Sequence, residues 1–446
     1  MRTYVNFETR TAHIKMATIQ KFTLRKVQGI VRYSLQGGLQ VRTMSSGGYL
    51  RDVPQGPPDK IIGLNDLFKA DTNPKKASLG VGAYRDDTGK PIVLDSVKEA
   101  ESRIINRGMD QEYAGIAGVP GYVEASLKFA YGDDSSPLKE NRVAAVQTLS
   151  GTGACRVAGE FFARFVGQGA KIYMPDPTWG NHIPIMKDSG LEPAKYKYYK
   201  ADSCSYDHEG FMSDIASNPD ESVYLIHACA HNPTGCDPSK EQWRELSQQL
   251  LKKKAIVFFD CAYQGFASGN AEQDAYAIRL FVEEGHNIML AQSFAKNFGL
   301  YGQRVGTLSV VCKDTVEKAR IESQLKLIIR PMYSNPPLHG ARVVEEVLND
   351  ASLRKKWEGE CAAMSKRIID MRALLRDSLA EKGSSKDWSH ITNQIGMFAF
   401  TGLSEEQVLK IRKEYSIYFT EDGRISIAGI NSGNIDHIAT AIHDVS

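Results

Sequence analysis

A lysine and an arginine eight residues apart have the most informative chemistry in this sequence. Lys296 follows the apolar run Ile288-Met-Leu-Ala291, which predicts a buried strand, and Arg304 stands among glycines. An amine that is buried at a strand end has a lowered pKa and reacts readily with carbonyl groups. A guanidinium group can bind a phosphate through two parallel hydrogen bonds. The pair therefore predicts a site for a carbonyl compound that carries a phosphate group.

Two further apolar runs end in polar side chains. Ile256-Val-Phe-Phe259 leads into Asp260 and Tyr263, and Val223-Tyr-Leu-Ile226 leads into a segment that contains Asn232. A carboxylate at a strand end can pair with a protonated ring nitrogen, and an amide can donate to a ring hydroxyl. The alternatives are a helix N-cap at Asp260 and a plain Asn-Pro turn at Asn232.

Small hydroxyl residues mark a predicted phosphate-binding turn. Ser150-Gly-Thr-Gly-Ala154 follows the run Val143-Ala-Ala-Val146 and opens a helical stretch that extends to Phe165. Backbone N–H groups at a helix N-terminus bind a dianion. The dinucleotide motif is excluded, because position 156 is arginine where that motif needs glycine. Trp179, further along the chain, could stack on an aromatic ring.

The spacing of Ser293 and Lys296 also matches the Ser-x-x-Lys signature of penicillin-recognising acyl enzymes. That class needs a Ser-x-Asn motif and a Lys-Thr-Gly motif downstream. Ser432-Gly-Asn434 matches the first of these only twelve residues from the end, and Lys-Thr-Gly does not occur. We therefore do not favour this alternative.

A metal site is a second alternative, because His227 and His231 lie close to Cys229 and Cys236. Their spacing fits no zinc motif well, and a histidine pair four residues apart would need a helix where a strand and an Asn-Pro turn are expected. We therefore expect no metal. The seven cysteines, an odd number, suggest reduced thiols.

Taken in order, these motifs resemble the aspartate aminotransferases of mitochondrial type, which are class I pyridoxal-phosphate-dependent aminotransferases. The resemblance runs from about Pro57 to the C-terminus and is most specific in residues 80–90, 227–235, 293–306 and 330–337. It implies an α/β protein of fold type I, with a mainly parallel seven-stranded sheet in a large domain and a smaller α/β domain. It also implies a homodimer with shared active sites and pyridoxal 5′-phosphate held by Lys296 as an aldimine.

The resemblance assigns a role to each site residue. Catalytic roles fall to Lys296, Asp260, Tyr113 and Trp179. The implied cofactor-binding residues are Ser150, Gly151, Thr152, Trp179, Asn232, Asp260, Tyr263, Ser293, Lys296, Arg304 and Tyr113. The implied substrate-binding residues are Gly82, Trp179, Asn232, Arg330 and Arg424. His182 and His227 are expected behind Asp260, and Tyr113 and Arg330 are expected to act in the partner's site.

The two substrate arginines indicate which substrate the enzyme takes. Arg424 resembles the residue that binds the α-carboxylate and Arg330 the residue that binds a distal carboxylate, and planar guanidinium groups suit both. The implied reaction is reversible amino transfer between aspartate or glutamate and oxaloacetate or 2-oxoglutarate. The alternatives are an aromatic or broad-specificity aminotransferase of the same fold, and an inactive relative that serves only as a binding or structural protein.

The first 44 residues differ in composition from the rest of the chain. They contain eight Lys/Arg residues and one acid, Glu8, which is typical of a mitochondrial transit peptide. The alternative is a basic tail that binds nucleic acid. Without these residues the totals of 55 basic and 53 acidic side chains become 47 and 52, which argues against a nucleic-acid partner. Met16 and Met44 could start a cytosolic form.

Strand-like runs that alternate with helical stretches predict a mainly parallel sheet. These runs end near Leu149, Met174, Ile226, Phe259, Ala291 and Val311. No stretch approaches the ~20 apolar residues of a membrane span. The expected organisation is a transit peptide (1–44), an arm (45–60), a small domain (61–90 and 384–446), a large domain (91–350) and an interdomain helix (351–383).

Overall fold

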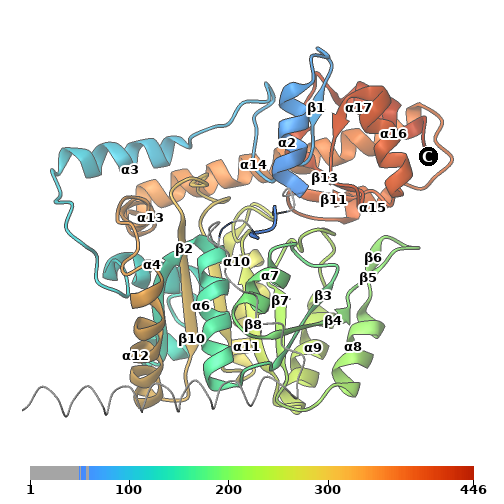
Figure 1. Cartoon of the computed structure of the whole chain (residues 1–446). Coiled ribbons are helices and arrows are strands. Elements are labelled where there is room, and N and C mark those ends of the chain that lie inside the picture. Colours follow the sequence, from blue (N-terminus) through green and yellow to red (C-terminus); the bar gives the residue numbers. More distant parts are fainter. Residues whose placement is uncertain (1–49, 51, 57–59) are drawn as a thin grey trace, which may run out of the picture. The chain divides into compact units, whose positions relative to one another are not determined.

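The computed structural model describes residues 50, 52–56 and 60–446 (Figure 1). The chain divides into two units, Met1–Pro58 and Asp59–Ser446, and every helix and strand described below belongs to the second. The predicted transit peptide and most of the predicted arm lie outside the described residues. Within the described part of the chain, no helix is both long and apolar enough to cross a bilayer.

A seven-stranded sheet forms the centre of the second unit and confirms the α/β prediction (Figure 1). In this sheet β10 runs antiparallel to both of its neighbours, whereas the other pairings are parallel. Burial is almost complete along four of the strands, Val143–Leu149, Val223–His227, Met289–Ser293 and Val305–Val311, as expected where helices cover both faces of a sheet. In spatial order the strands are β2 (Val143–Leu149), β10 (Val305–Val311), β9 (Met289–Ser293), β8 (Ile256–Cys261), β7 (Val223–His227), β3 (Lys171–Asp176) and β4 (Glu192–Lys197).

Helices pack on both faces of this sheet, each over its own hydrophobic core. One face carries α6 (Ser150–Phe165), α7 (His182–Asp188) and α12 (Thr315–Met332). The other carries α4 (Pro120–Tyr131), α8 (His208–Ser217), α9 (Lys240–Lys252) and α11 (Tyr276–Glu283). Four short elements lie between these helices and strands: α5 (Ser136–Lys139), β5 (Tyr199–Lys200), β6 (Ser205–Tyr206) and α10 (Ala271–Asp274). Helix α13 (His339–Asn349) packs against α4.

The remaining elements come from both ends of the described chain. Strand β1 pairs with β12 in parallel, and β11 pairs with β13 in antiparallel fashion. The first pairing joins the two segments that the sequence analysis assigns to a smaller domain, although the domain boundaries stay a prediction. The elements are α2 (Lys60–Ala70), β1 (Ala77–Ser78), α15 (Ser389–Asn393), β11 (Phe398–Phe400), α16 (Glu405–Tyr415), β12 (Ile417–Tyr418), β13 (Arg424–Ser426), the 3₁₀ turn Ile427–Gly429 and α17 (Ile435–His443).

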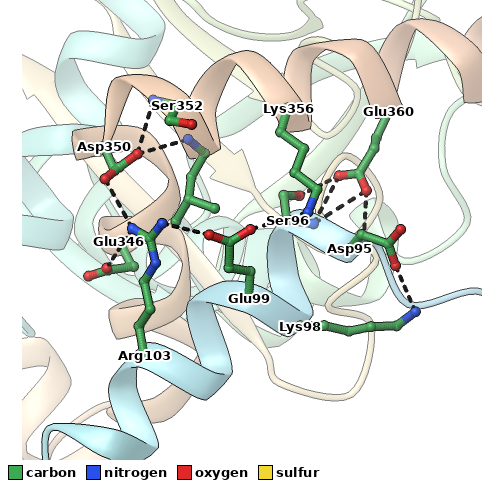
Figure 2. Close-up of polar contacts among 11 residues, drawn as sticks. Asp95, Ser96, Lys98, Glu99, Arg103, Glu346, Asp350, Ser352, Lys356 and Glu360 are labelled. Carbon is green, nitrogen blue, oxygen red and sulfur yellow. Dashed lines mark hydrogen bonds and ion pairs between the residues drawn. The ribbon is translucent and has the colours of Figure 1, made fainter.

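The long helix α14 (Ala351–Glu381) runs from α13 and α3 (Asp95–Asn106) to α15 and α17 (Figure 1). The carboxylate of Glu360, a residue of α14, accepts hydrogen bonds from the backbone N–H groups of Asp95 at 2.6 Å and Ser96 at 3.3 Å (Figure 2). The residue before α3, Leu94, offers no capping side chain. Glu360 therefore satisfies N–H groups that a helix start leaves free, and its charge suits that helix end. This contact joins α14 to the start of α3.

Candidate active site

The direction of the strands brings the predicted site residues to one edge of the sheet. Strands β2, β7, β8 and β9 all end at this edge, and in α/β proteins ligands bind outside the carboxyl ends of parallel strands. Strand β10 runs the other way, so its beginning lies where its neighbours end. The register pairs Val305 with Leu149 and Gly306 with Ser293. Arg304, directly before β10, therefore returns to the edge where Lys296 follows β9.

A cavity with about 540 Å³ of empty space, its open mouth included, lies at this edge. Ten of the eleven residues predicted to bind a cofactor line it, and Tyr113 does not. Cys229 and Ala262 also line the wall, and no pattern in the sequence indicated this. The lining residues are Ser150, Gly151, Thr152, Trp179, His227, Cys229, Asn232, Asp260, Ala262, Tyr263, Ser293, Lys296 and Arg304.

Lys296 is the amine of this cavity, and its Nζ lies 5.5 Å from the centre of the Tyr263 ring. Burial lowers the pKa of Lys296, the nearby Arg304 lowers it further, and Asp260 opposes this shift. A lowered pKa increases the fraction of neutral amine, which is the form that attacks a carbonyl carbon or accepts a proton. The environment therefore makes Lys296 suitable as a nucleophile and as a base.

Asp260 is the carboxylate of the cavity, and three side chains form a hydrogen-bonded group behind it. His182 Nε2 lies 3.0 Å from Asp260 Oδ2, and Thr178 Oγ1 lies 2.9 Å from His182 Nδ1 and 3.5 Å from His227 Nε2. Burial alone would raise the pKa of Asp260, but the hydrogen bond from His182 and the electrostatic interactions hold it below its usual range. Asp260 is therefore ionised and can pair with a cationic nitrogen. Both histidines lie where the sequence analysis expected them.

The part of the cavity formed by the start of α6 suits an anion. Helix α6 begins at Ser150, whose Oγ lies 3.0 Å from Ser293 Oγ and whose backbone N–H donates to the carbonyl of Arg304. At Gly151 a Cβ atom would lie 3.1 Å from the Cβ of Ser293, so a side chain would narrow this corner. A helix N-terminus, two hydroxyl groups and the Arg304 guanidinium together form a phosphate-binding arrangement.

A second cavity meets the first at Asn232, which lines both. Its wall contains Arg424, which is 6% exposed and donates to the carbonyl of Gly80 at 2.9 Å. The Arg424 guanidinium lies 4.2 Å above the Phe398 ring, and its Nε has no hydrogen-bond partner among the described residues. Gly82 touches the same ring, since a Cβ there would lie 2.6 Å from Phe398. A buried guanidinium with a free donor suits a carboxylate ligand.

Two predicted site residues, Tyr113 and Arg330, do not line the cavity of their own chain. Tyr113 is 88% exposed, and the exposed Arg330 donates to Ser334 Oγ at 2.7 Å. Ser334 bonds to Asn335, which in turn donates to the carbonyl of Ala114 at 2.6 Å. This chain of hydrogen bonds connects the segments of Tyr113 and Arg330. No ion pair to Arg330 occurs within residues 60–446.

The structure does not support the alternative of a metal site formed by the two histidines and two cysteines of residues 227–236. His231 Nδ1 lies 2.8 Å from Thr234 Oγ1, and His227 Nδ1 accepts from the N–H of Asn232 at 3.1 Å. In the described part of the chain, the group whose ligand atoms lie close enough for an ion is Cys155, His182 and Asp260. All seven cysteines are free thiols, as expected.

The fold and the site define an α/β enzyme whose cavity holds a reactive amine, a carboxylate and an anion site. A model of the family "Aminotransferase class I and II" matches residues 74–442, and the chain belongs to this family. The mitochondrial aspartate aminotransferase of Gallus gallus is 50% identical over 404 residues, which cover 91% of this chain and 96% of that protein.

Solved structures agree with this assignment. An aromatic-amino-acid aminotransferase from Burkholderia pseudomallei, covalently bound to pyridoxal phosphate, matches with a TM-score of 0.87 at 38% identity and covers 89% of this chain and 99% of its own. A mitochondrial aspartate aminotransferase from Trypanosoma brucei matches with a TM-score of 0.84 at 42% identity and covers 86% of this chain and 100% of its own.

Proposed function

We propose that this aminotransferase uses pyridoxal 5′-phosphate to transfer an amino group reversibly between L-aspartate and 2-oxoglutarate. The observation that carries the substrate assignment is a pair of arginines without carboxylate partners in the described chain. Arg424 is buried beside the cavity, and Arg330 is exposed next to the Tyr113 segment. A substrate with two carboxylates would occupy both guanidinium groups, and the relative from Gallus gallus is named for aspartate.

The cavity fits the proposed cofactor at three points. The Lys296 amine can bind its carbonyl carbon, the ionised Asp260 can pair with its ring nitrogen, and the α6 N-terminus with Arg304 can hold its phosphate. Trp179 and Asn232 would contact its ring from the wall. When bound, this cofactor supplies an electron-withdrawing ring that stabilises negative charge at the substrate Cα.

The side chains of the site then have separate tasks. The neutral Lys296 amine would accept the proton from the substrate Cα, because burial keeps its pKa low. Once protonated, Lys296 would be the group that donates this proton again. Asp260 keeps the ring nitrogen protonated, and His182 fixes the orientation of the carboxylate. Arg424 and the backbone at Gly82 orient the α-carboxylate, so that the Cα–H bond points towards Lys296.

The second carboxylate requires a partner subunit in this proposal. Tyr113 and Arg330 lie on connected segments of the surface and do not line their own cavity. We infer a homodimer in which Arg330 binds the distal carboxylate, and Tyr113 the phosphate, in the partner's site. The predicted arm, residues 45–60, would cross this interface.

The transit-peptide composition of residues 1–44 and the names of the relatives support location in the mitochondrial matrix. A reporter protein fused to residues 1–44 should enter mitochondria. A reporter that stays in the cytosol would contradict the location, and translation from Met16 or Met44 would give a cytosolic form.

An aromatic or broad-specificity activity is the second candidate, because an aromatic-amino-acid aminotransferase has a closely similar structure. Rates with aspartate, tyrosine and kynurenine, each with 2-oxoglutarate as acceptor, separate the two, and glutamate is assayed with oxaloacetate as acceptor. We expect kcat/KM for aspartate to exceed that for tyrosine by about 10² or more, because an unpaired distal arginine penalises an uncharged side chain. Equal values would favour the broad-specificity enzyme.

A further inference from the structure

Arg372, on the second half of α14, is a buried cation without a carboxylate partner in the described chain. Its side chain is 2% exposed, and it donates to the carbonyl oxygens of Ile391 at 2.7 Å and Gly396 at 2.8 Å and also to that of Phe398. Burial lowers the pKa of Arg372 to about 9, so the group stays charged at neutral pH. Burying this charge costs free energy, and the three hydrogen bonds offset part of that cost. The position of Arg372 therefore calls for a structural reason.

The acceptors lie within residues 391–398, a segment that includes the end of α15, the loop 394–397 and the first residue of β11, the strand beside Arg424. Strand β11 pairs with β13 in a register that places Phe400 opposite Arg424 and Phe398 opposite Ser426. The Arg424 guanidinium rests on the Phe398 ring at 4.2 Å. By binding the Phe398 carbonyl, Arg372 therefore fixes the position of the ring against which the Arg424 guanidinium packs.

The same loop touches the segment that carries Asn232. The N–H of Ile395 donates to the carbonyl of Gly235 at 2.7 Å. A Cβ at Gly396 would lie 2.5 Å from the Cβ of Ala230, so no side chain fits between the loop and this segment. The loop is held between Arg372 on one side and residues 230–235 on the other.

We propose that Arg372 is a positioning residue for recognition of the substrate's α-carboxylate. It holds the carbonyl groups of Ile391, Gly396 and Phe398. These contacts set the positions of the Phe398 ring, of Arg424 and of the Asn232 segment. An apolar side chain could fill the same volume, but it would leave three carbonyl groups without donors and release the loop. The inference rests on the proposed function, in which Arg424 binds the α-carboxylate.

The test compares two ligands of the cofactor-loaded protein by calorimetry. 2-Methylaspartate carries both carboxylates and has no Cα proton to lose, whereas 3-aminopropanoate is aspartate without its α-carboxylate. We expect Arg372→Met to weaken 2-methylaspartate binding by about 10-fold or more and to leave 3-aminopropanoate binding within about 2-fold, because only the first ligand needs a well-placed Arg424. Arg372→Lys, which keeps the charge and can donate to some of the carbonyls, should fall between wild type and Arg372→Met.

Two control variants distinguish a failure of the inference about Arg372 from a failure of the proposed role of Arg424 and from a general loss of stability. Ile438→Ala, in the buried core of α17, should lower the melting temperature and leave the ratio of the two dissociation constants unchanged. Arg424→Met should abolish the preference for 2-methylaspartate. If Arg424→Met changes the ratio and Arg372→Met does not, the inference about Arg372 is wrong and the proposed function stands. If Arg424→Met leaves the ratio unchanged, the proposed role of Arg424 fails and the role of Arg372 fails with it.

Discussion

The imidazole of His182 donates from Nε2 to Oδ2 of Asp260 over 3.0 Å, and the Asp260 carboxylate faces the cavity that contains Lys296. The other imidazole nitrogen is occupied by Thr178, which also approaches His227. The carboxylate is thereby fixed in orientation and held in its ionised form. A fixed negative charge at this point favours a protonated ring nitrogen in any bound cofactor.

Asp260→Asn tests this charge, because asparagine keeps the shape of the side chain and loses the charge. We expect kcat to fall by about 10²–10³, as is typical when one aligned electrostatic group is removed. His182→Asn should cause a smaller loss, since the Asp260 charge remains. Steady-state rates with aspartate measure both variants, and equal losses would mean that the histidine matters as much as the charge.

Arg330→Ala should reduce kcat/KM for aspartate by about 10²–10⁴, because the distal carboxylate loses a partner that contributes roughly 3–5 kcal/mol. The loss with tyrosine should be far smaller. Arg320→Ala is the matched control, since Arg320 is an exposed arginine on the same helix. If Arg330→Ala loses equally on both substrates, Arg330 does not recognise a carboxylate.

Mixing two inactive variants tests whether Arg330 acts across a subunit interface. A heterodimer of Lys296→Ala and Arg330→Ala subunits would contain one site with both native residues. Refolded mixtures should therefore regain part of the wild-type activity, whereas each variant alone should not. Verified heterodimers without recovered activity would mean that Arg330 does not act across the interface.

Gly306→Ala should destabilise the protein by several kcal/mol, which is the size expected when a buried atom meets backbone it cannot displace. A Cβ at this position would lie 2.5 Å from the carbonyl carbon of Ser150 and 2.6 Å from the carbonyl oxygen of Gln292. Gly302→Ala, in the preceding loop, meets no atom within 4 Å and is the control. Denaturant unfolding measures both, and equal stabilities would contradict the close approach of β10 to Ser150.

His227→Asn should remove part of the acid sensitivity of the fold. Burial lowers the pKa of His227 from 6.5 to about 3. Between these values the unfolded chain binds a proton that the folded protein does not, so folding stability falls as the pH falls. Wild type should lose about 2 kcal/mol more than His227→Asn between pH 7.5 and 5. Unfolding curves at both pH values measure this for wild type, for His227→Asn and for the control His443→Asn. Equal losses of unfolding free energy in all three proteins would contradict the prediction.

The sequence predicted the central elements of the fold because their patterns are local. Buried parallel strands form continuous apolar runs, and six of the seven strands were located in this way. Strand β4 was missed, since it lies at the sheet edge, has no continuous apolar run and is buried at a single residue, Tyr196. The long helix α14 was anticipated to within two residues of its C-terminal end.

The site residues could be predicted where a reactive side chain lies at or just after the end of an apolar strand, as Asp260 and Lys296 do. Thr178 was missed because a threonine in a turn shows no sign of the two histidines that it connects. Arg372 was missed for a different reason. Its acceptors lie 19 to 26 residues away, and nothing in a helical sequence indicates which carbonyl groups a buried arginine will hold.

The most direct test of the account is to find which lysine carries the cofactor. Borohydride treatment of the cofactor-loaded protein makes the link between amine and cofactor permanent, and peptide mass mapping then locates it. We expect the added mass on Lys296 alone. Lys296→Ala should still bind cofactor through the phosphate corner but should carry no added mass and should not transaminate. Added mass on another lysine of the wild-type protein, or turnover near the wild-type rate in Lys296→Ala, would contradict the proposed active site.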